Sequence, residues 1–333
     1  MGGRSRQAGY YVTTTSGAIP GRGVRNMHQG AGVAGSQRAG CRALVLGGGG
    51  AFGSVQAAYV AAAAEAGFAA DVVVGTSVGA LNAAWVAMYP GDVTRLLDIW
   101  RTLDGRKVVD LCLPAMLRRL IRRPLGIAAN TLVLELVEQY IGTCSFSDTR
   151  LPLAVTATNL SRGRKQVFQT GILSDAILAS TAVPGLFAPI ELRGELFVDG
   201  SLVAATDLAT AVEMGATEIL AIDLTPAPSA KQPRTPLDVL RRSLGIIGSS
   251  ATAAMEDCLR LRMPVSIVRP DLAQLSAWRV ATSLAAVHGY LDVARRTLAD
   301  VINSDGHLLS ADGAMNSFDR TPRSSIAAVP AIT

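Results

Sequence analysis

Cysteine and histidine are scarce in this 333-residue chain, and the few that occur stand far apart. The cysteines and histidines lie, with no C-x-x-C pair among them, at Cys41, Cys112, Cys144, Cys258, His28, His288 and His307. Structural zinc sites and disulfide frameworks both need such residues at short, regular spacings. The sequence therefore predicts no metal centre and no disulfide framework, and a reducing compartment such as the cytoplasm suits it best.

Charged residues are also few, at 17% of the chain, and they are unevenly distributed. The first 42 residues hold six arginines and no acidic side chain, whereas the remainder carries 25 basic and 26 acidic residues. The net charge of +5 thus comes from the N-terminal segment, and the rest of the chain is close to neutral. Because nucleic-acid binding needs basic residues gathered on the folded part, we expect no nucleic-acid partner.

Long apolar runs without turn residues are absent, although 49% of the residues are hydrophobic. The uncharged stretches 43–64 and 72–91 are both broken by glycines and polar side chains, so they predict buried strand-turn-helix units rather than membrane spans. Residues 1–41 have no apolar periodicity and no apolar segment of a secretory signal, which predicts a flexible basic tail.

The most informative stretch is Asp71-Val-Val-Val-Gly-Thr-Ser-Val-Gly-Ala-Leu-Asn82. Its valine run is typical of a buried parallel strand, and the Ala- and Leu-rich residues 78–88 predict the helix that follows. Ser77 then lies in the turn between them, flanked by Gly75 and Gly79 in the G-x-S-x-G pattern of a nucleophile elbow. Such a pattern can arise by chance in a chain rich in Ala and Gly, but the strand and the uncharged helix favour a catalytic serine.

A second strand, glycine loop and helix precede this turn. Residues 43–46 predict the strand, the loop contains Gly48, Gly49, Gly50 and Gly53, and residues 54–66 predict the helix. Backbone N–H groups in such a loop point into one small space and can hold an anion.

Two interpretations of the loop remain open. Its glycines match the G-x-G-x-x-G dinucleotide fingerprint, and Asp71 lies 18 residues beyond Gly53, near where a ribose-binding acid is expected. Asp71, however, begins a strand where that acid should end one. The loop can instead be the oxyanion hole for Ser77, because both loops would lie at the same carboxyl edge of a parallel sheet. We prefer the second interpretation, since it uses both motifs.

A serine nucleophile needs a base, and the chain offers two candidates. Of the histidines, only His288 lies outside the ends of the chain. Asp199 ends the predicted strand 195–198 and is followed by Gly200, so its carboxylate is expected at the same sheet edge as Ser77. An Asp-Gly pair by itself is more often a turn than a base.

The segment from Leu113 to Leu125 has the pattern of a basic amphipathic helix. Its apolar and basic residues alternate at helical spacing and are Met116, Leu117, Leu120, Ile121, Arg118, Arg119, Arg122 and Arg123. Such a helix either packs its apolar stripe on the core or docks reversibly on an anionic membrane surface.

Three motifs in this order resemble the patatin-like phospholipase family: the glycine loop 48–53, the serine turn 75–79 and Asp199-Gly200. The likeness extends through residues 179–189 and 215–224 and covers about residues 42–224, with a weaker echo at 289–296. The resemblance implies a three-layer α/β/α fold with a mainly parallel central sheet. It also implies hydrolysis of a phospholipid or other lipid ester by a Ser77/Asp199 dyad, without metal, nucleotide or other cofactor.

The chain departs from the family pattern at three places. Phe52 stands in the glycine loop where Arg or Lys is usual, and Ser201 follows Gly200 where Gly or Ala is usual. The Asn-x-Pro that often comes next is replaced by residues 204–207, Ala-Ala-Thr-Asp. Because backbone donors rather than the Arg charge stabilise an oxyanion, we expect activity to survive these changes.

We therefore expect a hydrolase domain over residues 42–304, with a core at 42–224, a helical insertion at about 91–150 and C-terminal helices at 237–302, followed by a flexible tail at 305–333. The protein is expected to be cytoplasmic and peripheral to membranes. A catalytically silent lipid-binding protein and a dinucleotide-binding oxidoreductase are the alternatives.

Overall fold

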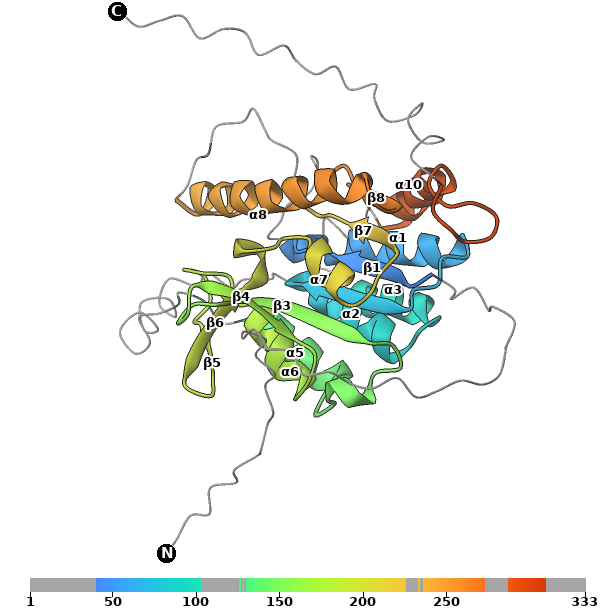
Figure 1. Cartoon of the computed structure of the whole chain (residues 1–333). Helices are drawn as coiled ribbons and strands as arrows, with labels where there is room; N and C mark the ends of the chain where they lie inside the picture. Colours follow the sequence, from blue (N-terminus) through green and yellow to red (C-terminus); the bar gives the residue numbers. More distant parts are fainter. Residues whose placement is uncertain are drawn as a thin grey trace, which may run out of the picture.

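An eight-stranded sheet forms the centre of the protein (Figure 1). The computed structural model describes residues 40–103, 126, 128, 130–225, 233, 236–272 and 287–309. The strand order is β5-β6-β3-β2-β1-β7-β8, and β4 pairs with β3 off this path. The strands are β1 Arg42–Leu46, β2 Val72–Thr76, β3 Leu153–Asn159, β4 Arg164–Phe168, β5 Ile190–Leu192, β6 Glu195–Asp199, β7 Glu218–Ile222 and β8 Val265–Val268.

The middle of the sheet is parallel and one end is antiparallel. β1 pairs in parallel with β2 and β7, β2 pairs with β3, and β7 pairs with β8. β4 and β6 run antiparallel to β3, and β5 runs antiparallel to β6. Strands β1, β2, β3 and β7 are buried along their length apart from Arg42, as expected for parallel strands covered on both faces.

Helices cover both faces of the sheet. They are α1 Gly53–Glu65, α2 Val78–Met88, α3 Val93–Thr102, α5 Thr131–Tyr140, α6 Leu173–Ser180, α7 Leu208–Glu213, α8 Pro236–Arg260 and α10 Val287–Ala299. Alternate residues of β1 face opposite layers: Leu44 and Leu46 pack with α1, α2, α3 and α10, whereas Ala43 and Val45 pack with α7 and α8. The predicted three-layer α/β/α fold with a mainly parallel sheet is confirmed (Figure 1).

Most of the elements expected around the two glycine-rich turns are present, but the helices after residue 236 differ from the prediction. The sequence pattern predicts two helices, at 237–247 and 250–262, separated near Gly248, whereas α8 is continuous from Pro236 to Arg260. Gly248 does not end the helix. A side chain there would lie 2.7 Å from both Ala205 Cβ and the Ser201 carbonyl oxygen, so glycine permits α8 to approach the turn after β6.

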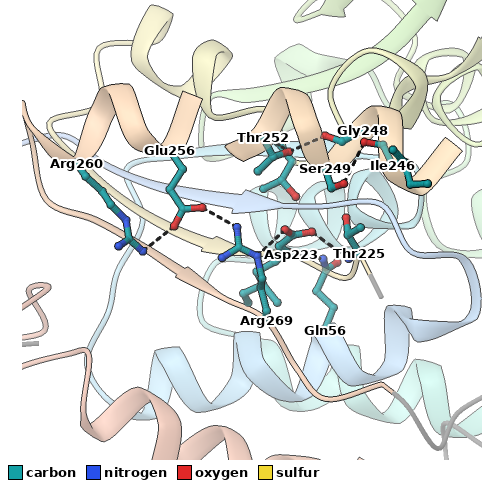
Figure 2. Close-up of polar contacts among 12 residues, drawn as sticks. Gln56, Asp223, Thr225, Ile246, Gly248, Ser249, Thr252, Glu256, Arg260 and Arg269 are labelled. Atoms are coloured by element: carbon teal, nitrogen blue, oxygen red, sulfur yellow. Dashed lines mark hydrogen bonds and ion pairs between the residues drawn. The ribbon is translucent and has the colours of Figure 1, made fainter. Parts of the chain in front are cut away.

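An ion-pair cluster ties α8 to the ends of β7 and β8. Arg269, just after β8, donates to Asp223 at 3.1 Å and to Glu256 of α8 at 2.7 Å. Arg260 donates to the same Glu256 at 2.6 Å. Figure 2 shows Arg269 between the two carboxylates. Because both carboxylates are buried, this cluster fixes the position of α8 more firmly than an exposed ion pair would.

Two sequence predictions depend on parts of the chain outside this description. The predicted amphipathic helix from Leu113 to Leu125 and residues 1–39 of the tail predicted at 1–41 lie outside the described residues. None of the described helices has both the length and the apolar character needed to cross a bilayer.

A close backbone approach between α2 and β1 gives a stability test. Helix α2 crosses the end of β1 so closely that a Cβ on Gly79 would lie 2.6 Å from the Gly47 carbonyl oxygen and still nearer to that of Leu46. Gly79→Ala should therefore lower the free energy of unfolding by about 1–3 kcal/mol or more, since the obstacle is backbone.

The matched control is Gly245→Ala, because a Cβ there meets nothing within 4 Å inside α8. Alanine is favoured over glycine in a helix by about 0.5–1 kcal/mol, so this variant should be as stable as the parent or more stable. Thermal unfolding measures both. Equal melting temperatures for the two variants would contradict the packing described.

Candidate active site

Strand pairing brings two distant segments to one point beside β3. β2 pairs with the first half of β3 as far as Thr76 opposite Thr156, and β6 pairs with the second half from Asp199 opposite Ala157. Because β4 occupies the other edge of β3, β2 and β6 lie end to end along the same edge. Their carboxyl ends therefore face each other, and Ser77, which follows β2, meets Asp199.

Ser77 occupies a strained turn between β2 and α2. Its φ is 54° and its ψ is −126°, and in the described part of the chain only Ser77 and Arg193 are non-glycine residues with positive φ. The Ser77 amide donates to Ser180 Oγ at 2.8 Å, and that hydroxyl donates to the Thr156 carbonyl at 2.6 Å. Ser180 thus ties the turn to β3. A backbone of this kind costs about 1–3 kcal/mol and is typical of functional turns.

The serine hydroxyl and the aspartate are hydrogen-bonded inside the protein. Ser77 Oγ donates to Asp199 Oδ2 at 2.6 Å, and the two residues are only 6% and 4% exposed. The amide of Ser201 donates to the other carboxylate oxygen, Oδ1, at 2.8 Å. The Asp199 backbone is held by its own N–H, which donates to Ala182 O at 2.9 Å, and by Thr158 Oγ1, which donates to its carbonyl at 2.8 Å.

Burial raises the pKa of the Asp199 carboxyl above its ordinary value. Hydrogen bonds from the Ser77 hydroxyl and from the amide and hydroxyl of Ser201 lower it in part. A carboxylate with a raised pKa is a stronger base than an exposed one, and it already accepts the proton that a serine nucleophile must lose.

The glycine loop lies against this pair. A Cβ on Gly48 would collide with the Ser201 hydroxyl and lie 3.1 Å from Ser77 Cβ, so the loop can approach only as glycine. The amide of Gly48, however, donates to the Ala205 carbonyl at 2.9 Å. The sequence predicts Gly48 as an oxyanion donor, and its engaged amide does not favour that role. In the described part of the chain, the amides of Gly49 and Gly50 have no acceptor.

A fully buried chain of amides supports the loop. Gln56 of α1 donates to the carbonyl oxygens of Gly47, at 3.0 Å, and Ile222, at 3.2 Å. Asn82 of α2 donates to Gln56 Oε1 at 2.9 Å, and the Trp100 ring N–H of α3 donates to Asn82 Oδ1 at 2.8 Å. This hydrogen-bond network couples the glycine loop to α2, the helix that begins directly after Ser77.

Sequence reasoning did not identify Gln56 and Trp100 as part of the site. The available signal was a lone side-chain amide in each of two largely apolar helices, Gln56 in α1 and Asn82 in α2, because a buried amide needs a hydrogen-bond partner. Which residue would be that partner depends on how α1, α2 and α3 pack.

The remaining predicted glycines are all at close contacts. A Cβ on Gly75 would lie 2.6 Å from Ala80 Cα, on Gly53 it would collide with Trp100 and Val78, and on Gly200 it would collide with the Thr156 carbonyl. These residues allow the elements around Ser77 and Asp199 to pack together, as expected for supporting positions.

Other predicted residues do not join the site. Phe52 is 3% exposed and belongs to the core beside α1, so the position where the family usually has Arg or Lys is apolar here. Asp71 precedes β2 at the opposite sheet edge from the glycine loop and accepts a hydrogen bond from the Arg42 amide at 2.8 Å. This placement does not suit a ribose-binding acid. The side chain of His288 is outside the described part.

The described residues also contain no group of three His, Cys, Asp or Glu side chains that could hold a metal ion. The site as described is thus a serine in a strained strand-to-helix turn, a buried carboxylate and a glycine loop, at the carboxyl edge of an α/β sheet.

This combination matches a known family. A family model described as patatin-like phospholipase matches residues 44–212, just over half of the chain and the whole of the site. The chain belongs to the patatin-like phospholipase family.

Curated relatives are similar to this chain over part of their length. An uncharacterised NTE family protein of Mycobacterium bovis is 29% identical over 182 residues, covering 55% of this chain and 48% of the relative. Lysophospholipase NTE1 of Phaeosphaeria nodorum is 29% identical over 184 residues, covering 54% of this chain but 12% of the relative. The chain thus spans about half the length of the first relative and a small part of the second.

Two solved structures have a more distant likeness. VipD from Legionella pneumophila is 14% identical with a TM-score of 0.41, covering 77% of this chain and 67% of that one. The type III effector protein ExoU is 18% identical with a TM-score of 0.29, covering 77% of this chain and 53% of that one.

The buried carboxylate predicts a pH-dependent stability difference. The pKa of Asp199 is raised in the folded state above the ordinary carboxyl value of about 3.9. At pH values between the unfolded-state and folded-state pKa, the folded protein therefore keeps a proton on Asp199 that the unfolded chain has lost. The contribution of the Asp199 carboxyl to stability is complete below its unfolded-state pKa and is lost as the pH rises through its raised folded-state pKa. An asparagine side chain carries no charge, so Asp199→Asn should melt a few degrees higher than the parent at neutral pH.

The measurement is the melting temperature of both proteins from about pH 4 to about pH 9. The difference should grow with pH through this window and then become constant. Two parallel curves would show that burial of the Asp199 charge does not destabilise the fold.

Proposed function

We propose that this protein is a lipid acyl hydrolase that cleaves carboxylic esters of phospholipids or lysophospholipids, with Ser77 as the nucleophile and Asp199 as the base. The observation that carries the proposal is the 2.6 Å hydrogen bond from Ser77 Oγ to Asp199 Oδ2 in a buried site. Membership of the patatin-like phospholipase family and the lysophospholipase name of fungal relatives support the choice of lipid esters.

The geometry suits a two-step acyl transfer. Ser77 Oγ attacks the ester carbonyl carbon as its proton passes to Asp199 Oδ2, and a tetrahedral intermediate forms. The intermediate collapses by breaking the bond to the alcohol oxygen, which takes the proton from Asp199. Water then attacks the acyl-enzyme, again giving its proton to Asp199, and the acid is released as Ser77 recovers its proton.

Stabilisation of the oxyanion falls to the glycine loop in this proposal. Gly49 and Gly50 are our candidate donors, since their amides have no acceptor among the described residues. Each well-placed donor is worth about 3 kcal/mol of transition-state stabilisation. The N-terminus of α2, which begins at Val78 directly after the nucleophile, adds a favourable dipole for negative charge at the same place.

Contact with the lipid surface is part of the proposal. The segment from Leu113 to Leu125 remains our candidate for reversible docking, because its four arginines can meet anionic head groups, each worth about 1 kcal/mol near the surface. We also propose that the protein works as a peripheral enzyme at cytoplasmic membrane surfaces.

Hydrolysis by purified Ser77→Ala protein tests the function. The expected result is loss of at least about 10³-fold in kcat/KM towards a soluble short-chain ester and towards lysophospholipid micelles, because the nucleophile is missing. The protein should stay folded with a melting temperature lower by no more than several degrees, because the turn backbone is retained while the buried Asp199 carboxylate loses one hydrogen bond.

The control variant is Ser54→Ala. Ser54 is buried at the start of α1, directly after the glycine loop, and its hydroxyl has no hydrogen-bond partner among the described residues. Its removal should leave hydrolysis unchanged. Near-parental hydrolysis by Ser77→Ala would refute the proposed nucleophile.

A further inference from the structure

Asp207 is a buried carboxylate that the reaction scheme above does not use. It is the N-cap residue of α7 and is only 2% exposed. Its oxygen Oδ1 accepts from the Thr210 amide and from Lys165 Nζ, each at 3.1 Å. The other oxygen, Oδ2, accepts from Thr156 Oγ1 at 2.7 Å, from Thr210 Oγ1 at 2.8 Å and from Lys165 Nζ at 3.1 Å. Both carboxylate oxygens are therefore held by several donors.

These contacts join the sheet to the segment that leads from β6 to α7. Thr156 lies in β3 and Lys165 in β4, whereas Asp207 and Thr210 belong to the start of α7. Lys165 also donates to Thr210 Oγ1 at 2.9 Å. A carboxylate this deeply buried depends on such partners, because a charge without them is costly to bury. Asp207 therefore fixes the segment before α7 on the sheet.

The two residues before Asp207 contact the glycine loop directly. The Ala205 carbonyl accepts the Gly48 amide at 2.9 Å. A Cβ on Gly47 would collide with Thr206 Oγ1 and lie 3.2 Å from the Ala205 carbonyl oxygen. Ala205 and Thr206 are 4% and 2% exposed, so the contact is buried. A shift of Asp207 would therefore move the surface against which the loop packs.

Thr156 connects the same carboxylate to the turn that carries the nucleophile. Its hydroxyl donates to Asp207, while its carbonyl accepts the Ser180 hydroxyl at 2.6 Å. Ser180 Oγ in turn accepts the Ser77 amide at 2.8 Å. The glycine loop and the nucleophile are thus both held to one residue of β3, and rigid elements of this kind suit a site that needs precise geometry.

We propose that Asp207, paired with Lys165, is a positioning residue that holds the glycine loop at the distance from Ser77 that oxyanion binding requires. This inference rests on the proposed function, because it assigns the loop that role. Among the described residues, the hydrogen bonds of Asp207 reach no reacting group, so it acts through the Ala205 carbonyl. It lies in the stretch 204–207, which replaces the Asn-x-Pro common in the family.

The kinetic test is Asp207→Ala, with kcat and KM measured for a soluble short-chain ester. Loss of one oxyanion donor costs an enzyme about 10²–10³-fold in kcat, so a loop that can shift should cost about tenfold or more. KM should stay within about threefold of the parent, because the loop acts on the transition state. Asp207→Asn keeps the side-chain size and one acceptor oxygen, so its kcat should fall between those of the parent and Asp207→Ala.

The matched control is Glu218→Ala. Glu218 is also a buried carboxylate, 7% exposed, and it contacts His307 and the Leu308 amide. It begins β7 opposite Arg42 of β1, at the sheet edge away from the glycine loop. Its removal should lower the melting temperature, as Asp207→Ala does, but leave kcat unchanged. The pair of variants separates positioning from a general loss of stability.

A second measurement needs no activity. Hydrogen exchange, read by mass spectrometry on a peptide that spans residues 47–53, reports local opening of the glycine loop. Exchange there should be about tenfold faster in Asp207→Ala than in the parent, and unchanged in Glu218→Ala. If the parent hydrolyses no ester, the proposed function fails, while this measurement still decides whether Asp207 holds the loop.

Equal effects of Asp207→Ala and Glu218→Ala on loop exchange and kcat would overturn the positioning role and leave the proposed hydrolase intact. A higher KM with an unchanged kcat would do the same. If Asp207→Ala does not fold, the comparison is made between Asp207→Asn and Glu218→Gln. Faster loop exchange with lower kcat in Asp207→Asn alone supports the role, and equal values overturn it.

Discussion

One strand, β3, sets the position of the whole site. Its first half pairs with β2 and its second half with β6, so the carboxyl ends of two strands meet at Thr156 and Ala157. The hydrogen bond between Ser77 and Asp199 exists because of that meeting. Since both groups are almost fully buried, the hydrogen bond is stronger than it would be in water, and a lost partner would leave a buried polar group unsatisfied.

Close backbone packing is what makes the meeting possible. Gly79 lets α2 cross β1, Gly200 lets the turn after β6 touch β3, and Gly48 lets the loop lie against Ser77. Each of these contacts excludes a side chain. The strained backbone of Ser77 and the buried charge of Asp199 both reduce stability. The large apolar core beneath them, on both faces of the sheet, offsets that cost.

Sequence predicted the parts of the site that are local. The strand, turn and helix around Ser77 lie within one short segment, so hydrophobic period and glycine spacing were sufficient, and α2 has the predicted bounds. Asp199 could be placed at a strand end by the same reasoning. The three-layer fold class followed from the resemblance of the glycine loop, the serine turn and Asp199-Gly200 to the patatin-like phospholipase family.

Features that depend on packing between distant segments could not be predicted. The continuity of α8 through Gly248 depends on the turn it touches, and the engagement of the Gly48 amide depends on Ala205, far along the chain. Local pattern indicates that Gln56 and Asn82 need partners but does not identify them.

The most direct test of the central claim is to treat the protein with a fluorophosphonate probe and locate the label by peptide mass spectrometry. A serine made nucleophilic by a neighbouring base reacts with such a probe, whereas a structural or lipid-binding serine does not. The account predicts one modified residue, Ser77, with much slower labelling in Asp199→Asn. A folded protein that is not labelled, or is labelled at another serine, would contradict it.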